Sequence, residues 1–209
     1  MIRKAFVGGL ILGALLTVNF WSHSWLRPGK TVSEESAAAA QGVNLHKTVA
    51  VMLERTLHKS GQRWSDSQFK ATADAIAACS AKYHYPPELI LGLIQVESSM
   101  DITAHSSAGA LGLTQVLPST AREVARQLKL PYTTPSDLYK PGLNIRIGIA
   151  YLSSLENQMG SLSMALAGYN MGANAVLARV KVSGSVPRQV YYDAVFRNTQ
   201  LLASYTPPK

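Results

Sequence analysis

The sequence predicts an all-α fold, and three observations carry this prediction. Apolar residues recur at helical spacing along most of the chain, and no window shows sustained alternation between apolar and polar residues. Proline, Ser or Thr residues stand where several of these helical segments would begin. No internal repeat is evident. The 209 residues leave room for one folded domain and an additional segment.

Composition and charge narrow the class of protein. A hydrophobic content of 47% excludes a disordered chain. The excess of Lys and Arg (20) over Asp and Glu (12) gives a net charge of +8, which suits nucleic acid, anionic lipid or an anionic cell-wall polymer. The basic residues are scattered, with no stripe interleaved with aromatic residues, so we predict no nucleic-acid partner. The single Cys79 excludes an intramolecular disulfide and a cysteine-rich metal site, and its small-residue surroundings predict a buried structural thiol.

Residues 1–26 are predicted to form an N-terminal membrane anchor. Arg3 and Lys4 precede an uncharged apolar run of about 17 residues, which is at the lower limit for spanning a bilayer. No small-x-small cleavage site follows this run closely, and no cysteine near its end offers a lipidation site. Trp21 and Trp25 suit a membrane interface. A cleaved signal peptide is the alternative interpretation.

Two segments, residues 27–43 and 44–64, separate this apolar run from the main domain. The first contains Ser, Glu, Ala and Gly without periodicity, and we interpret it as a linker. In the second, Val49, Met52, Leu53 and Leu57 recur at helical spacing, which predicts a short amphipathic accessory helix. The sequence leaves open whether this helix belongs to the folded domain.

The main domain is predicted to span residues 65–205. Ser65 and Gln68 form a capping-box pattern at the start of its first helix, and Pro86-Pro87 ends that helix and begins the next one. Residues 131–141 are predicted to be a loop. Apolar stripes and stop signals predict the remaining helices, over residues 118–128, 144–158, 161–169, 173–180 and 187–203.

Glu97 stands at the end of the helix predicted over residues 87–98. This segment is apolar on nearly every side, which is typical of a helix that is buried all round. Burial disfavours an ionised carboxylate and raises its pKa, as in a general acid that works at neutral pH. The alternative is that Glu97 only marks the point where the helix reaches solvent. On position alone, both interpretations stay open.

Several kinds of catalytic chemistry lack the residues that they require. The five histidines lie far apart, without HExxH or similar spacing, so we predict no metal site. Residues 105–109 lack the first glycine of a G-x-S-x-G motif and follow a helix rather than a strand. Glycoside cleavage remains, and it generally uses two carboxylates, unless the substrate supplies its own nucleophile. Beside Glu97, the candidates for a second carboxylate, none of them compelling, are Asp101, Glu123, Asp137 and Asp193.

Four groups of residues appear in a fixed order along the chain. They are Glu97-Ser98; Ser106-x-x-Gly109-Ala110-x-Gly112-Leu113-Thr114-Gln115; Asn144-Ile145-x-x-Gly148-x-x-Tyr151-Leu152; and Gly168-Tyr169-Asn170-x-Gly172, followed by Tyr191-x-x-x-Val195. Their order and spacing resemble the SLT-type lytic transglycosylase domain, named after soluble lytic murein transglycosylases. The resemblance covers residues 65–203 and implies a lysozyme-like helical fold related to goose-type lysozymes.

The resemblance implies that the chain cleaves peptidoglycan between N-acetylmuramic acid and N-acetylglucosamine without water. Glu97 would protonate the glycosidic oxygen and then deprotonate the C6 hydroxyl of the muramoyl residue, which closes on C1 to give a 1,6-anhydro product. A tethered nucleophile explains why one carboxylate is enough. No cofactor is implied. The alternatives are a hydrolytic muramidase of the goose-type lysozyme kind and a non-catalytic peptidoglycan-binding module.

The resemblance also implies which residues bind the substrate. Gln115 is expected to bind a sugar, and Tyr169 and Asn170 are expected to lie in the glycan cleft, with Tyr169 near enough to contact the catalytic acid. Thr114 and Gly168 stand where many family members have Met and Ala, and both positions are expected to line the cleft. The other expected substrate-binding residues are Ser98, Ser106, Gly112, Leu113 and Tyr191.

The predicted anchor and the implied substrate together predict a location in the bacterial cell envelope. The chain would be anchored in the inner membrane with its catalytic domain in the periplasm, or exported to the periplasm after signal cleavage. Its expected partners are peptidoglycan glycan strands and the inner membrane. An envelope-spanning secretion or conjugation assembly is a further candidate partner, and wall turnover and phage entry are equally compatible settings.

Overall fold

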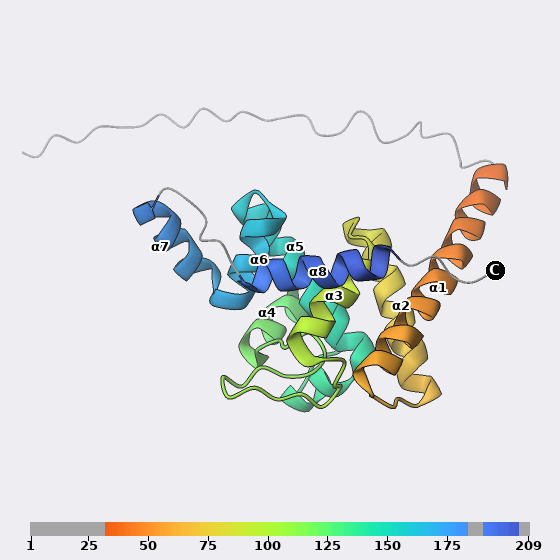
Figure 1. Cartoon of the computed structure of the whole chain (residues 1–209), viewed down its shortest axis with the longest axis horizontal. Coiled ribbons are helices and arrows are strands. Elements are labelled where there is room, and N and C mark those ends of the chain that lie inside the picture. The colour runs from red at the N-terminus through yellow and green to blue at the C-terminus, as the bar shows by residue number, and fades with distance from the viewer. Residues whose placement is uncertain (1–31, 184–189, 205–209) are drawn as a thin grey trace, which may run out of the picture. The chain divides into compact units, whose positions relative to one another are not determined.

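The computed structural model describes residues 32–183 and 190–204, and within these ranges the chain is helical, as predicted. Short bridges pair His105 with Leu111 and Leu111 with Val116, and they are the β-structure of the described part. The helices are α1 (Val32–Ser60), α2 (Asp66–Tyr83), α3 (Pro87–Ser98), α4 (Pro118–Leu128), the 3₁₀ helix η1 (Pro135–Tyr139), α5 (Pro141–Met159), α6 (Leu162–Met171), α7 (Ala173–Ser183) and α8 (Val190–Ala203) (Figure 1).

The predicted anchor, residues 1–26, lies outside the described residues. Among the helices that the structure does describe, none combines the length and the apolar character that crossing a membrane requires. The described residues from Ala38 onward belong to one compact unit, and residues 32–37, at the start of α1, are assigned to a second one.

Helix α1 differs from the predicted linker over residues 27–43, because the chain is helical from Val32 onward. The run from Ala37 to Ala40 explains this difference, since Ala has the highest intrinsic helix propensity and outweighs the neighbouring Ser and Gly residues. The later part of α1, within the predicted accessory segment 44–64, carries the expected apolar stripe. Its four apolar residues are buried in the main core, namely Val49, Met52, Leu53 and Leu57.

Local signals set the helix boundaries of the main domain. The capping box predicted at Ser65 and Gln68 is present at the start of α2. Helices α3, α4 and α5 each begin with a proline in the first turn, where the missing N–H is not needed. The segment 131–141, predicted to be a loop, contains the short helix η1. Cys79 is buried, as predicted, and burial raises the pKa of its thiol to about 11.

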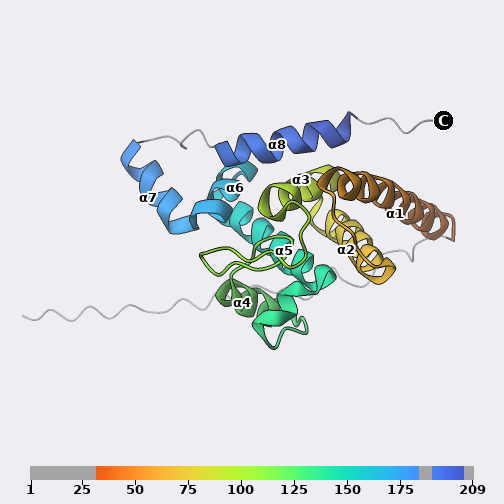
Figure 2. The same ribbon diagram turned by 60° about the horizontal axis from the view of Figure 1, so that its bottom comes forward.

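Helix α3 is the centre of the main core, as its sequence predicts. Every residue from Leu89 to Ile94 is buried. Helix α8 lies along α3, which Figures 1 and 2 show from two directions. The two helices approach closely at Gly92, where an added Cβ would lie 2.8 Å from Thr199 Oγ1 and 3.0 Å from the carbonyl oxygen of Val195. This close packing brings the start of α8 to the end of α3, where Glu97 lies.

Helix α5 separates the main core from a smaller one. Ile145 and Ile149 pack into the main core, whereas Ile147 packs into the second core. The second core also holds Leu111 and Val116, which flank a loop, and side chains from α4 and η1. The loop between α3 and α4 is therefore fixed on α5 by its own apolar residues.

Candidate active site

Glu97 lies half-buried in the last turn of α3 and is hydrogen-bonded to a residue that is distant in sequence. The hydroxyl of Tyr191, in the first turn of α8, donates to Glu97 Oε1. Burial raises the pKa of Glu97 to about 7, and the hydrogen bond from Tyr191 lowers it by a smaller amount. The carboxyl group can therefore be protonated or ionised near neutral pH.

The contact between Glu97 and Tyr191 follows from the packing of α3 on α8. Val195, one turn after Tyr191, is fully buried in the main core and fixes the rotation of α8. The sequence analysis predicts Tyr191 to bind substrate, whereas in the structure its hydroxyl is bonded to the carboxylate. Burial and the charge of Glu97 raise the pKa of Tyr191 far above its usual value, so it remains a hydrogen-bond donor.

Tyr169, on α6, lies near Glu97 but is bonded elsewhere. Its hydroxyl donates to the carbonyl oxygen of Thr114 at 2.7 Å. Burial and then the negative charge of Glu97 raise the pKa of Tyr169. Tyr169 is therefore close enough to Glu97 to be affected by its charge, but its hydroxyl is bonded to Thr114. The hydroxyl that bonds to Glu97 belongs to Tyr191.

The loop before α4 is held in a tight conformation by a glycine and a glutamine. Gly112 has φ of +74°, and a Cβ at this position would lie 2.2 Å from the carbonyl oxygen of Leu138. Only glycine adopts this conformation in so small a space. Gln115 also has positive φ, +46°, and its Nε2 donates to the carbonyl oxygens of Ala104 and Gly112 at 3.2 and 2.9 Å. The side chain of Gln115 thus supports the loop that carries it.

A pocket of about 260 Å³ lies between this loop, α5 and α6. It brings together three predicted site residues, Gln115, Tyr169 and Asn170. The ring of Tyr151 packs against that of Tyr169, with 5.4 Å between centroids, and also lines the pocket. The lining is completed by residues that the sequence did not assign to the site, namely Val116, Leu117, Thr120, Met171 and Gly172. Tyr151 was not assigned to the site either. Both Tyr151 and Gly172 belong to the quoted motifs, and this was the signal available in the sequence.

Three residues that were expected to line the cleft are buried inside the fold. Leu113 is fully buried in the main core, so its side chain cannot bind a substrate and instead supports the loop from beneath. Thr114 is also fully buried and bonded to Asn144. Gly168 is buried against Met159, whose sulfur would lie 2.8 Å from an added Cβ. The expectation that Thr114 and Gly168 line the cleft is therefore wrong.

Two of the predicted serines are used in local structure. Ser98 Oγ donates to the carbonyl oxygen of Ile94 within α3. Ser106 Oγ accepts from the backbone N–H of Ala110 at 3.0 Å, which closes the turn around Gly109. In the part of the chain that the structure describes, neither hydroxyl is hydrogen-bonded to Glu97.

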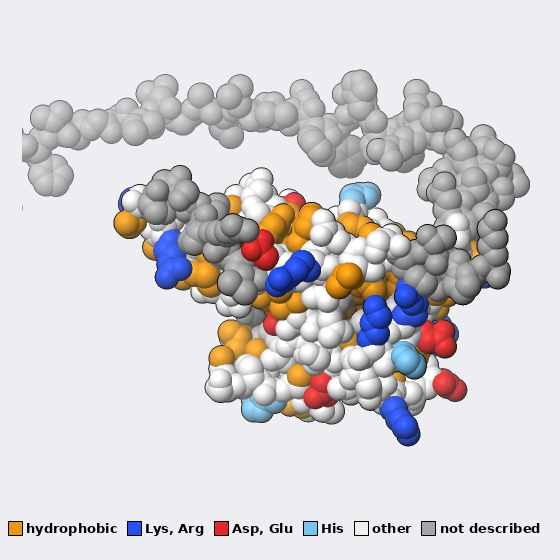
Figure 3. Space-filling model, in the orientation of Figure 1, with side chains coloured by type: hydrophobic (Ala, Val, Ile, Leu, Met, Phe, Trp, Pro, Cys, Tyr) orange, Lys and Arg blue, Asp and Glu red, His pale blue; other side chains and the backbone are white. Residues whose placement is uncertain are grey.

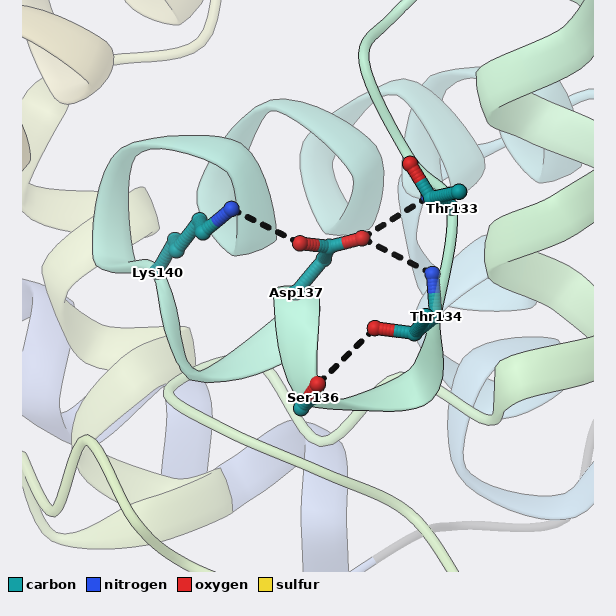
Figure 4. Close-up of polar contacts among 5 residues, drawn as sticks. All are labelled: Thr133, Thr134, Ser136, Asp137 and Lys140. Carbon is teal, nitrogen blue, oxygen red and sulfur yellow. Dashed lines mark hydrogen bonds and ion pairs between the residues drawn. The ribbon is translucent and has the colours of Figure 1, made fainter.

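Three of the four candidates for a second carboxylate have local partners. Asp101 accepts from the backbone and hydroxyl of Thr103. Glu123 is exposed and paired with Arg126 on α4. Asp137 accepts from the backbone N–H groups of Thr133 and Thr134 and from Lys140 Nζ (Figure 4). The hydrogen bond from Lys140, followed by those from the two backbone groups, holds the pKa of Asp137 well below its usual value.

The fourth candidate, Asp193, lies in the first turn of α8. Within residues 32–183 and 190–204, no group of three His, Cys, Asp or Glu side chains is placed to hold a metal ion.

Comparisons with known proteins point to one family. The family described as "Transglycosylase SLT domain" matches residues 74–191. The chain is 36% identical to a "Membrane-bound lytic murein transglycosylase C" of Haemophilus influenzae, over 56% of this chain and 38% of the relative. It is 30% identical to a "Transglycosylase" of Enterobacteria phage PRD1, over 65% of this chain and 45% of the relative. The chain thus spans less than half the length of either relative.

A solved structure supports the fold. The 70 kDa soluble lytic transglycosylase of Escherichia coli superposes with a TM-score of 0.52 at 22% sequence identity, covering 83% of this chain and 29% of that one. At this identity the likeness supports the helical architecture of the chain.

Proposed function

Because the chain belongs to the transglycosylase SLT domain family, we propose that it is a peptidoglycan lytic transglycosylase that uses Glu97 as its only catalytic carboxyl group. The observation that carries the proposal is the state of this group. Glu97 is half-buried, bonded to the Tyr191 hydroxyl and has a pKa raised to about 7. A carboxyl group with this pKa is able to give a proton and take one back at neutral pH.

In the first step, protonated Glu97 donates its proton to the oxygen that joins N-acetylmuramic acid to N-acetylglucosamine. The bond from the muramoyl C1 to this oxygen breaks, and the N-acetylglucosamine leaves with a free 4-hydroxyl group. Positive charge develops on C1 and its ring oxygen. Glu97 is now an ionised carboxylate beside that charge.

In the second step, the C6 hydroxyl of the same muramoyl residue attacks C1, and Glu97 accepts the hydroxyl proton. The product is a 1,6-anhydro sugar, and Glu97 returns to its protonated form without consuming water. Since the nucleophile is tethered to the electrophilic carbon, proximity replaces the second carboxylate of a hydrolase. The local bonding of Asp101, Glu123 and Asp137 is consistent with this single-carboxylate chemistry.

We assign glycan binding to the pocket that Tyr169 lines, since Tyr169 is also close enough to Glu97 to be affected by its charge. Tyr169 and Tyr151 offer aromatic faces, and Asn170 is exposed at its edge. Gln115 uses its Nε2 within the loop, so its amide oxygen is the group proposed to accept a hydrogen bond from a sugar hydroxyl. Tyr191 is proposed to hold and donate to Glu97 instead of binding the sugar.

The proposed setting is the bacterial envelope. The apolar N-terminal run would anchor the chain in the inner membrane, with the domain from residue 65 to residue 205 in the periplasm and α1 packed against it. The net charge of +8 would favour contact with an anionic wall polymer. On the face shown in Figure 3, the Lys and Arg side chains are scattered, as suits a polymer approached from several directions rather than a groove for one duplex.

Digestion of purified sacculi by the full-length chain tests the proposal. Mass spectrometry should find muropeptides that end in anhydro-muramic acid, which are one water lighter than the products of hydrolysis. Products that have gained water would identify a hydrolytic muramidase instead. Glycan binding without any released product would identify a binding module. Release that continues unchanged in Glu97→Gln would show that the acid is assigned wrongly.

A further inference from the structure

Asn144, at the start of α5, is fully buried and has every hydrogen-bonding position of its side-chain amide filled. Its Oδ1 accepts from the backbone N–H of Thr114 at 2.8 Å and from Thr114 Oγ1 at 2.7 Å. Its Nδ2 donates to the carbonyl oxygens of Leu111 and Leu138 at 2.9 and 3.0 Å. A primary amide has two donor hydrogens and two acceptor lone pairs, so this set is complete when the Thr114 hydroxyl donates to Oδ1, the nearer of its two acceptors; the other is the Asn144 carbonyl oxygen at 3.2 Å.

These four bonds join parts of the chain that carry the pocket wall. Leu111 and Thr114 lie at the two ends of the turn that contains Gly112, and Leu138 belongs to η1. The approach is close enough to require glycine at two places. A Cβ on Gly112 would lie 2.5 Å from Asn144 Nδ2, and a Cβ on Gly148 would lie 2.3 Å from Thr114 Oγ1. The turn is therefore clamped on α5 through one side chain.

The clamp continues directly into the pocket. The carbonyl oxygen of Thr114 accepts the hydroxyl of Tyr169 at 2.7 Å. The next residue, Gln115, has φ of +46°, which is uncommon for a residue with a side chain. Both Tyr169 and Gln115 line the pocket, whereas Asn144 is separated from it by Thr114. The position of the two pocket residues thus depends on how Asn144 holds Thr114.

We propose that Asn144 is a positioning residue for glycan binding, which sets the placement of Gln115 and Tyr169 through Thr114. The inference rests on the proposed function, because it takes a glycan as the ligand of the pocket. It goes beyond that function by assigning a role to a residue that does not reach the substrate. An amide is required at this position, since only an amide donates to two carbonyl groups while it accepts from an N–H and a hydroxyl.

Replacing the amide of Asn144 with a carboxyl group distinguishes a positioning role from a role in packing alone. Asn144→Asp keeps the size of the side chain and the oxygen that accepts from Thr114. The second oxygen faces the carbonyl groups of Leu111 and Leu138, which repel it when it is ionised. When protonated, it donates to one of them. Glycan binding by this variant should therefore become dependent on pH, which a loss of packing volume would not cause.

The test measures binding by isothermal titration in the full-length Glu97→Gln chain, in which Glu97 no longer titrates. The probe is a soluble tetrasaccharide of alternating N-acetylglucosamine and N-acetylmuramic acid. We expect Asn144→Asp to raise Kd about tenfold or more at pH 8, because the ionised side chain loses both hydrogen bonds to carbonyl oxygens, and leaving a buried polar group unpaired already has an effect of this size. At pH 5 the protonated side chain should bind within about threefold of its parent. The fitted stoichiometry reports the folded fraction separately from Kd.

Three further variants keep the result interpretable if Asn144→Asp folds poorly at pH 8. Thr114→Val removes the hydroxyl bond to Asn144 and should weaken binding by about threefold to tenfold, whereas Thr114→Ser should restore it. Ser80→Ala on α2, which removes a buried bond to the carbonyl oxygen of Tyr85 just beyond the end of that helix, is the matched control and should lower stability without changing Kd.

The outcomes are distinct. Equal Kd values for the parent, Asn144→Asp and Thr114→Val at both pH values would overturn the positioning role. A parent that does not bind the tetrasaccharide would overturn it together with the proposed ligand. If these variants behave as expected but the chain with intact Glu97 releases no anhydro product from sacculi, the positioning role stands and the proposed reaction fails.

Discussion

Glu97 and Asp137 both carry their carboxyl groups on helices, yet their pKa values are shifted from the usual values in opposite directions. Glu97 lies in the last turn of α3, where burial raises its pKa to about 7. Asp137 lies in η1 with a side chain that is 11% exposed, and its pKa is held well below the usual value. The difference lies in two causes: desolvation is the largest influence on the pKa of Glu97, whereas hydrogen bonds from its donors are the largest influence on that of Asp137. Asp137 accepts from two backbone N–H groups and Lys140 (Figure 4), whereas Glu97 accepts from Tyr191.

The comparison shows that a buried position does not by itself raise the pKa of a carboxyl group. Hydrogen bonds to an ionised carboxylate offset the loss of water, and a cation adds to them. Asp137 has enough of both to stay ionised, and it serves as a helix cap. Glu97 has too few donors to compensate for burial, so its proton is held near neutral pH. Each of the following predictions changes one side of this contrast.

The largest expected effect is on activity. Glu97→Gln should lower the release of anhydro-muropeptides from sacculi by about 10³-fold or more, since general acid and base catalysis are lost together. Asp137→Asn should leave the activity per folded molecule unchanged, because its partners lie in the cap. Product release measured by mass spectrometry, with the folded fraction measured by circular dichroism, checks both. Equal losses of activity in the two variants would mean that the raised pKa of Glu97 is not what the reaction uses.

The next largest expected effect is on the stability of the folded chain at alkaline pH. The pKa of Glu97 in the folded chain, about 7, is above the usual 4.5, so the folded state binds this proton more tightly than the unfolded state. Stability from this group is present below pH 4.5 and is lost as pH rises through 7. Glu97→Gln should therefore stabilise the chain by about 2 kcal/mol at pH 9 and have little effect near pH 4. Denaturant unfolding at the two pH values measures the difference, and a destabilised variant at pH 9 would contradict it.

Tyr191→Phe removes the hydrogen bond that the Tyr191 hydroxyl donates to Glu97 and keeps the aromatic ring. Since this bond lowers the pKa of Glu97, its loss should raise that pKa further. The fall in activity above neutral pH should then move to higher pH, and the rate at the optimum should drop about tenfold because the acid is less well oriented. Tyr192→Phe, the same change on the next residue of α8, is the control. A pH–rate profile that stays in place would show that Tyr191 does not tune the acid.

Most of the fold could be predicted from the sequence because its signals are local. Prolines and a capping box set helix starts, and apolar spacing identified the buried character of α3. The helical start of α1 was missed, since Ala-rich residues 37–40 without an apolar stripe are compatible with a linker or a helix. The 3₁₀ helix η1 was missed because five residues show no periodicity.

The site was predicted less completely, because its contacts are distant in sequence. The bond between Tyr191 and Glu97 depends on the packing of α8 along α3, which no local pattern reveals. In the loop, side-chain directions do not follow a period, so Leu113 and Thr114 were placed at the cleft although both are buried. Gln115 lines the pocket, and the turn before it is hydrogen-bonded to Asn144, a contact across 30 residues that no local pattern reveals.

The smallest expected effect concerns the cap around Asp137 at acidic pH. Its pKa in the folded chain is below the usual 3.8, so the folded state favours the ionised form more than the unfolded state does. The stability that this group contributes is present above pH 3.8 and is lost as pH falls through its lowered pKa. Asp137→Asn should lower Tm at pH 7, and this difference from the wild type should shrink as the pH is lowered below 3.8. Tm values measured by circular dichroism from pH 7 to pH 2 check this. A difference that grows towards low pH would mean that Asp137, like Glu97, is held by burial rather than by its donors.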